Sequence, residues 1–357
     1  MSKQYMALSR QTVRNEINAV PTYMFYKLKG KLEPEPDFKE EATREWAGQD
    51  FAQGDTEHTR TSTAWKFAWE SRLFPSVELS LLLEFLLGYA STPATVDTTA
   101  SRVMFRTISE IFAPDSPLVD NALALLPHTD KAGTTYHQQF VGGRIKDGEL
   151  DFKGGADAML KLNFIGGPWI GDPGQAEVAG MTFPATRQFR AGNLRCFLGA
   201  GATLTGTVPN YTDIAEGSMP AFKPDDLTVK ITPNVDDKYK MNGYEGPSVT
   251  ERTGSWELTV EGTVDFEDPS SGWSSYDAWV AQFADMAYVP FMLKLDSGEV
   301  VGAVDQTAQM YLYVPKMKLT TDMPDRKTDG SKTKIKVKLT SLIDPAINVA
   351  AFAKLIY

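Results

Sequence analysis

The sequence contains very few of the residues that build metal and thiol chemistry. Of 357 residues, one is cysteine and three are histidine. Cys196 therefore has no partner for an intrachain disulfide, and no cysteine-based zinc site can form. His58, His128 and His137 stand at unrelated spacings, without the His-Glu-x-x-His pair of a metalloprotease. We expect no metal, no cofactor and a buried, inert thiol.

Basic residues and long apolar runs are also scarce. Lys and Arg number 36 against 46 Asp and Glu, a net charge of −10, which disfavours tracking along a DNA backbone because such binding replaces counterions with protein cations. The most apolar run, residues 79–87, is far shorter than the ~18 residues that cross a bilayer. The first twenty residues lack the apolar core of a signal peptide. We expect a soluble protein of a reducing compartment, with no membrane partner.

Catalytic and nucleotide-binding motifs are missing as well. Residues 199–201 fail the dinucleotide fingerprint because Leu204 takes the place of the third glycine, and no Walker loop occurs. Ser218 lacks the second glycine of a nucleophile elbow. Glu70 and Glu261 recur at equivalent positions of two similar segments, which favours a shared structural part over the carboxylate pair of a glycosidase. The sequence therefore predicts no catalytic or cofactor-binding residues and a protein that is not an enzyme.

What the sequence does have is strict alternation in two similar segments. Residues 65–73 and 256–264 place apolar side chains at every second position, with few exceptions, the pattern of a half-buried strand. The two segments superimpose without a gap, so that Trp65 falls on Trp256. Chance similarity between two amphipathic strands is one explanation, and an internal duplication is the other.

A helix is predicted after each of these strands. Ser76 can cap a helix over residues 77–87, and Gly88 suits the left-handed position beyond its end. Eight of these eleven residues are large and apolar, so the helix is expected to be buried nearly all round. After the second strand, Ser274 and Ser275 open a helix whose apolar residues recur at helical spacing.

The elements around each strand and helix repeat too. A strand-like segment precedes each copy, over residues 23–32 and 226–231, and a hairpin with a Gly-Gly or Asp-Gly turn follows it. The hairpins are predicted over residues 144–152 with 158–164 and 311–320 with 334–339. The repeated order predicts an α+β, mainly β fold made of two tandem β-sandwich or barrel units, each with one packed helix.

Composition suggests where the units divide. We predict a first unit over residues 1–166, a connector rich in Gly and Pro over 167–223, and a second unit over 224–357. Residues 101–126 insert helix-like material into the first unit only. Its acidic segment, residues 33–57, is expected to be a loop, and loops of ~25 residues are usually functional or disordered.

Two charged segments are candidates for contacts between subunits. The acidic segment carries nine acids and two bases, and lysines recur at every second position from 332 to 338, on one strand face. One explanation is structural: the acidic segment is a solvated loop, and the lysines protect an edge strand against aggregation. The alternative is that the two segments meet between subunits, where opposite charge sets register. The candidate residues are Glu40, Glu41, Glu45, Asp50, Lys332, Lys334, Lys336 and Lys338.

The arrangement resembles the tail-tube (major tail) proteins of long-tailed bacteriophages, in a duplicated-domain form. The likeness is carried by residues 65–88, by the glycine-bounded stretch 142–166 and by the hairpin around 314–342. It implies tail-tube-like units that form rings, stacked into a tube through which DNA passes without specific binding. It also implies a trimeric ring with pseudo-sixfold symmetry, or alternatively a hexamer.

The resemblance carries further implications about partners and place. Tape-measure, terminator and baseplate proteins of the tail would be partners, and the protein would be assembled in the host bacterial cytoplasm and reside in the virion. Two other functions stay open. One is another tail ring protein, such as a terminator or baseplate hub, and the other is a carbohydrate-binding or carbohydrate-active β-sandwich protein. For the latter, the tryptophans at 65, 69, 256 and 279 stand in apolar phase, which favours the core over sugar stacking.

Overall fold

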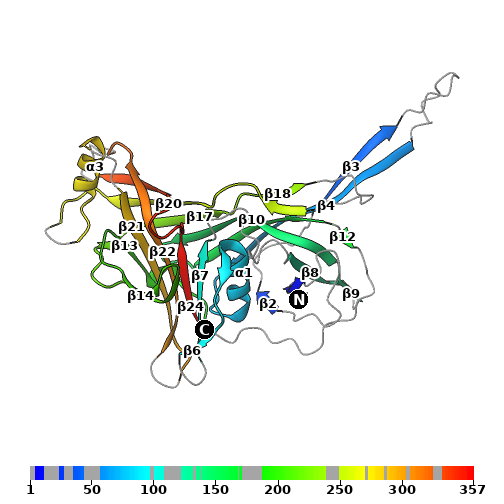
Figure 1. Cartoon of the computed structure of the whole chain (residues 1–357), viewed down its shortest axis with the longest axis horizontal. Coiled ribbons are helices and arrows are strands. Elements are labelled where there is room, and N and C mark those ends of the chain that lie inside the picture. The colour runs from blue at the N-terminus through cyan, green and yellow to red at the C-terminus, as the bar shows by residue number, and fades with distance from the viewer. Residues whose placement is uncertain are drawn as a thin grey trace.

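The chain is mainly β, as predicted. The computed structural model describes residues 5–11, 24–27, 35–43, 57–96, 100–107, 122–131, 134–137, 139–167, 169–170, 187–238, 249–269, 272–284, 288–302, 306–324 and 332–357. Within them, most strands belong to one large antiparallel sheet. Helices α1 (Val77–Leu87) and α3 (Ser275–Ala284) lie against its strands (Figure 1). Strands β10, β17 and β20 run across the body, and β13, β21, β22 and β24 run steeply away from them.

The strands divide by position in the chain. Those of the N-terminal half are β1 (Tyr5–Gln11), β2 (Met24–Lys27), β3 (Glu35–Thr43), β4 (Glu57–Arg72), β5 (Gly88–Ala90), β6 (Ala94–Thr95), β7 (Ser101–Thr107), β8 (Ala122–Lys131), β9 (Thr134–His137), β10 (Gln139–Lys153), β11 (Met159–Gly166) and β12 (Trp169–Ile170). Those of the C-terminal half are β13 (Leu194–Leu198), β14 (Thr203–Thr207), β15 (Asn210–Ala215), β16 (Ala221–Phe222), β17 (Asp226–Thr232), β18 (Val235–Lys238), β19 (Val249–Arg252), β20 (Glu257–Asp265), β21 (Tyr288–Val300), β22 (Thr307–Thr321), β23 (Lys334–Ser341) and β24 (Phe352–Ile356). A short 3-10 helix, η1 (Ala191–Asn193), precedes β13.

The same seven strand pairings occur twice along the chain. In the first set, β1 pairs with β2 and β8, β10 pairs with β8, β11 and β12, and β4 pairs with β3 and β11. In the second set, β13 pairs with β16 and β21, β22 pairs with β21, β23 and β24, and β20 pairs with β17 and β23. The helices occupy equivalent places in the two sets, because α1 contacts β10 and α3 contacts β22, the counterpart of β10.

The strand register agrees with the superposition of residues 65–73 on 256–264. Trp69 of β4 lies opposite Leu162 of β11, and Val260 of β20 lies opposite Leu339 of β23. The second set begins at β13, so β13 and β16 lie inside residues 167–223, the predicted connector, and are part of the sheet.

Among the described residues, two strand pairings connect the N-terminal and C-terminal halves of the chain. Strand β10 of the first set pairs with β17 of the second over six residues, from Gly148 opposite Ile231 to Lys153 opposite Asp226. The C-terminal strand β24 pairs with β7, which follows α1. The two sets are therefore joined edge to edge within one sheet.

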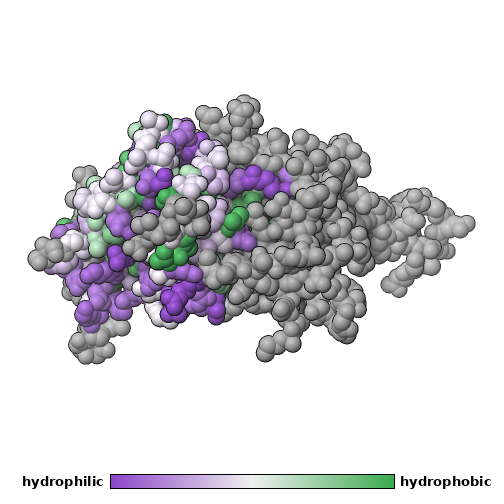
Figure 2. All heavy atoms as spheres, turned by 90° about the horizontal axis from the view of Figure 1, so that it is seen from below, coloured by the Kyte–Doolittle hydropathy of each residue, from purple (hydrophilic) through white to green (hydrophobic). Residues whose placement is uncertain are grey.

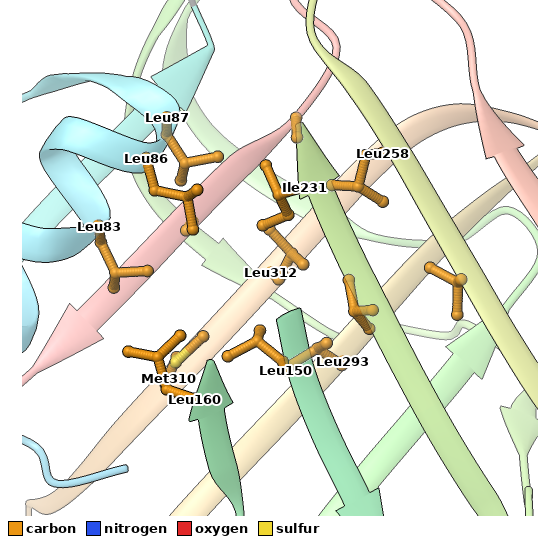
Figure 3. Close-up of a cluster of buried hydrophobic side chains, with 14 of the residues drawn as sticks. Leu83, Leu86, Leu87, Leu150, Leu160, Ile231, Leu258, Leu293, Met310 and Leu312 are labelled. Atoms are coloured by element: carbon orange, nitrogen blue, oxygen red, sulfur yellow. The ribbon is translucent and has the colours of Figure 1, made fainter. Parts of the chain in front are cut away.

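Both sets contribute to one hydrophobic core. Figure 3 shows leucines of α1 pointing toward strands of both sets. The labelled members are Leu83, Leu86 and Leu87 from α1, Leu150 and Leu160 from the first set, and Ile231, Leu258, Leu293, Met310 and Leu312 from the second. Alternation along β10, β11, β17 and β20 sends these side chains inward and the charged residues outward.

Helix α1 has the predicted bounds and the predicted caps. The Ser76 hydroxyl accepts a hydrogen bond from the backbone N–H of Leu79 at 3.4 Å, and Gly88 ends the helix with φ of 104°. A residue with a Cβ atom is strained at such an angle. The two predicted hairpins are also confirmed, as β10–β11 and β22–β23.

Three local predictions are wrong. Residues 101–107 and 122–126, expected to be helix-like, belong to strands β7 and β8, where pairing with distant strands overrides local preference. The strand at residues 24–27 was expected to pair with β4, but it pairs with β1. The upstream partner of β4 is β3, which lies inside the segment predicted as a loop. The lysine-bearing β23 is not an edge strand, because it lies between β20 and β22.

Candidate inter-subunit surfaces

The acidic segment forms one side of a two-stranded arm. Strand β3 pairs with residues 57–66 of β4, and the two strands extend away from the body of the molecule (Figure 1). In the described part of the chain, β3 has no other partner strand and β11 reaches only residues 65–72 of β4. We call residues 35–43 with 57–64 the arm. An isolated two-stranded hairpin is marginal in water, and its outer edge presents unpaired backbone groups.

The arm contains two of the four predicted acidic contact residues. Glu40 and Glu41 lie in β3, next to a register shift between Lys39 and Glu40. Glu45 and Asp50 lie outside the described residues. The arm is thus acidic in sequence and, among the described residues, open along one edge, and a contact with another chain can use both properties.

The four lysines of β23 and its approach lie on the polar face of the sheet, and three hold carboxylates of their own chain. Lys332 bonds Asp265 at 2.7 Å, Lys334 bonds Asp225 at 2.6 Å, and Lys338 pairs with Glu261 at 2.9 Å. The hydrogen bonds to Asp265 and Asp225 raise the pKa of Lys332 and Lys334. The fourth lysine, Lys336, has no ion-pair partner among the described residues and lines a groove beside Lys338 and Asp322.

This polar face carries charges of both signs across the strands of both sets. Lys161 bonds Glu149 at 2.6 Å and Asp151 at 3.3 Å, and the bond to Glu149 raises its pKa. The acidic members of the face include Glu70, Asp147, Glu149, Asp151, Asp226, Glu257, Glu261 and Asp265, and the basic members include Lys66, Arg72, Lys153, Lys161, Lys230, Lys318, Lys334, Lys336 and Lys338. The face is therefore mixed in sign and offers no continuous basic track. Figure 2 views the molecule from below, and the described residues on that side are largely hydrophilic, with hydrophobic ones between them.

A second charged cluster holds the β14–β15 hairpin against the sheet. The Lys354 ammonium lies 2.9 Å from Asp213 and 3.9 Å from the centroid of the Tyr311 ring. Lys294 donates to Glu216 at 3.0 Å, and the Tyr311 hydroxyl bonds the same carboxylate at 3.4 Å. Burial lowers the pKa of Lys354. Burial would raise the pKa of Glu216, but its backbone hydrogen bond and Lys294 bring it below its usual value. Every member is occupied by a neighbour, so the cluster acts as a structural clamp.

One cavity among the described residues is lined in part by the single cysteine of the chain. A pocket of about 640 Å³ is lined by apolar and charged side chains, among them Phe152, Phe222, Lys153 and Arg195. The thiol of Cys196 also lines it, and burial raises the pKa of that thiol far above its usual value. A protonated thiol is not a nucleophile, so the predicted inert character of Cys196 agrees with its surroundings.

The repeated glutamates do not converge on one cleft. Glu70 lies on β4 and Glu261 on β20, with strands β11, β10 and β17 between them. Four strand spacings of about 4.8 Å separate them by roughly 19 Å. Glycosidase carboxylates lie about 5–9.5 Å apart, so these two occupy the same structural position in two sets of strands.

Of the four tryptophans predicted to lie in the core, three are buried and Trp279 is partly buried. Trp65, Trp69 and Trp256 are buried, as the apolar phase of their strands predicts. One proximity that sequence spacing does not reveal is the pairing of His128 with His137 across β8 and β9. In the parts of the chain that the structure describes, no three His, Cys, Asp or Glu side chains are grouped to hold a metal ion. No helix in those parts has the length and apolar character needed to cross a membrane.

Compared with known protein families and with curated proteins, the chain matches no family model and no curated sequence. Its function is therefore argued from the doubled set of strands, the open arm and the surfaces described above.

Proposed function

We propose that this protein is the subunit of a bacteriophage tail tube, a structural virion protein that is not an enzyme. In this proposal its two sets of strands are tandem tail-tube-like units, each with one packed helix. Copies of the chain form rings, the rings stack into a tube, and DNA passes through the tube into the host.

The observation that carries the proposal is the joint between β10 and β17. It joins the first set to the second, edge to edge, over six residue pairs. The counterpart of β10 is β22. Counting from Glu35, which corresponds to Thr232, the counterpart of residues 226–231 of β17 is residues 29–34, which lie outside the described residues. In the described part of the chain, β22 pairs with β23 alone beyond Lys318, and β3 pairs with β4 alone. Among the described residues, the counterpart of the β10 half of the joint is thus open on β22. A second copy that fills it would make a head-to-tail contact, which closes into a ring or grows into a filament.

The presence of the same seven strand pairings in both sets favours a trimeric ring over the alternative hexamer. If both sets of a chain lie in the ring, three chains supply six units and a pseudo-sixfold symmetry. If only one set lies in the ring, six chains are needed and the other set decorates the outside. Both sets here keep all seven pairings and join through one sheet, which supports the arrangement with three chains.

The polar face of the sheet suits a conduit. Its alternating carboxylates and lysines, such as Glu261 beside Lys338 and Glu149 beside Lys161, compensate one another within the chain. Specific or tight binding to DNA needs a surplus of cations that release counterions. A face of this kind lining the channel lets DNA pass without specific binding. The remaining partners are the tape-measure, terminator and baseplate proteins, in a virion assembled in the host bacterial cytoplasm.

Electron microscopy of the full-length purified chain tests the proposal. We expect concentrated protein to form rings or tubes whose end-on views show sixfold features built from three chains. Protein that stays monomeric at every concentration and is missing from purified tails would overturn it. The alternative of a terminator or baseplate ring protein is separated by copy number, because a tube protein is present in many copies per virion and a ring protein in few.

A further inference from the structure

The pocket beside Cys196 has an apolar lining of ligand-binding size. Its volume is about 640 Å³, within the roughly 300–1,000 Å³ that ligand pockets span. Four residues of its lining are buried in the core, namely Phe152, Cys196, Phe222 and Leu227. Protein interiors contain few voids larger than a water molecule. A small molecule can therefore enter this space without repacking the core.

The pocket exists because strand pairing stops beside it. Strand β16 pairs with β13 through two residue pairs, Cys196 with Phe222 and Phe197 with Ala221. The chain then passes through Pro224 into β17, which pairs with β10 and β20 instead. Figure 1 shows β10 and β17 running across the body and β13 running steeply away from them. Residues from both groups of strands line the pocket, so it belongs to the joint between the two sets.

Two cations lie next to each other at this pocket. Arg195 and Lys223 both line it and both are exposed. They are the next residues beyond the Cys196–Phe222 pair on two antiparallel strands, so continuing the register by one position places them opposite each other. Like charges opposite each other on neighbouring strands are destabilising. Arg195 also lies opposite Lys294 of β21, which makes a row of three cations.

The other charged groups of the lining already have partners. The bonds that hold the lining carboxylates join Glu216 to Lys294 at 3.0 Å, Asp225 to Lys334 at 2.6 Å, and Asp226 to the backbone N–H of Thr263 at 2.8 Å. The third lining cation, Lys153, lies 3.5 Å from Asp151. Among the described residues, Arg195 and Lys223 have no ion-pair partner. An anion from outside the chain would relieve the repulsion between them.

We propose that this pocket binds a small organic anion with an apolar body. The Arg195 guanidinium and the Lys223 ammonium hold the anionic head, because the guanidinium fork donates two parallel hydrogen bonds to a carboxylate or a group of similar shape. The body of the ligand packs against the apolar lining and removes it from water. All these residues belong to one chain, so the site goes beyond the proposed function and does not depend on assembly.

Titration calorimetry of the full-length chain with 2-naphthoate tests the site. We expect one molecule to bind per chain, with a dissociation constant of about 1 mM or tighter. The neutral analogue 2-naphthamide should bind about tenfold or more weakly, because it lacks the charge that strengthens the hydrogen bonds. Sulfate, an anion without an apolar body, should not displace 2-naphthoate at equal concentration.

Two double variants locate the binding. Arg195→Gln with Lys223→Gln should weaken the binding of 2-naphthoate by about tenfold or more, to the level of the neutral amide. The matched control is Lys230→Gln with Lys336→Gln, which removes two exposed lysines that do not line this pocket and should bind as the wild type does. Circular dichroism and thermal melting check that both variants are folded.

Three results would overturn the proposal. The first is that 2-naphthoate shows no saturable binding to the wild type. The second is that 2-naphthamide binds as tightly as 2-naphthoate, which would remove the role of the anionic head. The third is that the folded variant of Arg195 and Lys223 binds as the wild type does. Binding is measured per chain, so none of these results depends on whether rings or tubes form.

Discussion

The indole N–H of Trp256 donates a hydrogen bond of 2.8 Å to the backbone carbonyl of Leu86, 170 residues earlier in the chain. Leu86 lies in the last turn of α1, where carbonyl groups have no partner within the helix. Trp65, the counterpart of Trp256 in the first set, instead packs edge-on against Phe140, with 5.3 Å between ring centroids. Equivalent tryptophans thus have different partners, and the second set completes the helix of the first.

Removing this hydrogen bond should destabilise the whole molecule. Trp256→Phe keeps an aromatic ring but leaves the buried Leu86 carbonyl without its donor. We expect the free energy of unfolding to fall by about 1–3 kcal/mol, the cost of an unsatisfied buried group, measured by urea unfolding. Trp273→Phe is the matched control, because Trp273 is partly exposed and contacts Phe222 through its ring. Equal losses in the two variants would contradict the assigned role.

The cap of α1 gives a second prediction. Ser76→Ala removes the side-chain acceptor for the Leu79 N–H and should lower the free energy of unfolding by about 1 kcal/mol, the usual value for such a cap. Ser76→Thr retains a hydroxyl and should recover most of the loss. The measurement is again the midpoint of chemical unfolding, and a Thr variant as unstable as the Ala variant would show that the hydroxyl is not the cause.

The clamp on the β14–β15 hairpin should respond differently to loss of its two partners. Asp213→Asn leaves the buried ammonium of Lys354 without its carboxylate and should cost about 1–3 kcal/mol of unfolding free energy, less than for a fully buried pair because the Asp213 side chain is 39% exposed. Lys354→Met replaces the ammonium by an apolar group of similar length and should cost less. A Met variant less stable than the Asn variant, by thermal or urea unfolding, would reverse this order and refute the account.

The buried thiol makes stability depend on alkaline pH. Burial raises the pKa of Cys196, so above 9.0, the reference pKa of the thiol, the unfolded chain loses a proton that the folded chain keeps. This group therefore lowers the free energy of unfolding as pH rises, by up to about 1.4 kcal/mol per pH unit. Cys196→Ala lacks this effect. Its stability deficit relative to wild type should shrink between about pH 8 and about pH 10 in reductant, and a constant deficit would contradict the prediction.

Local signals allowed much of the secondary structure to be predicted. The bounds and both caps of α1, the two hairpins after the helices and the repeated strands follow from apolar spacing and from turn residues that act over a few positions. The acidic segment could not be read this way, because its strand β3 is defined by pairing with β4 rather than by its own composition. The same holds for β7, which is a strand because β5 and β24 lie beside it.

The candidate contacts were predictable as charges but not as positions. Sequence spacing places the lysines from 332 to 338 on one face of a strand. It does not show that Asp265, Asp225 and Glu261 of the same chain already hold three of them. The surroundings of Lys316 give no signal in the sequence, because Tyr288 of β21 and Leu342 after β23 lie beside it only through the pairing of the strands.

The sequence by itself determined the class of the protein, a mainly β chain with a doubled order of elements and without metal or catalytic motifs, because periodicity, capping and composition are local properties. Tertiary structure alone decided how the two sets join, since the β10–β17 pairing links residues far apart and depends on which edges remain open. It also decided why equivalent positions differ. At Gly148 a Cβ atom would lie 2.9 Å from the Leu86 side chain of α1, whereas the equivalent Leu319 has a large side chain buried in the core.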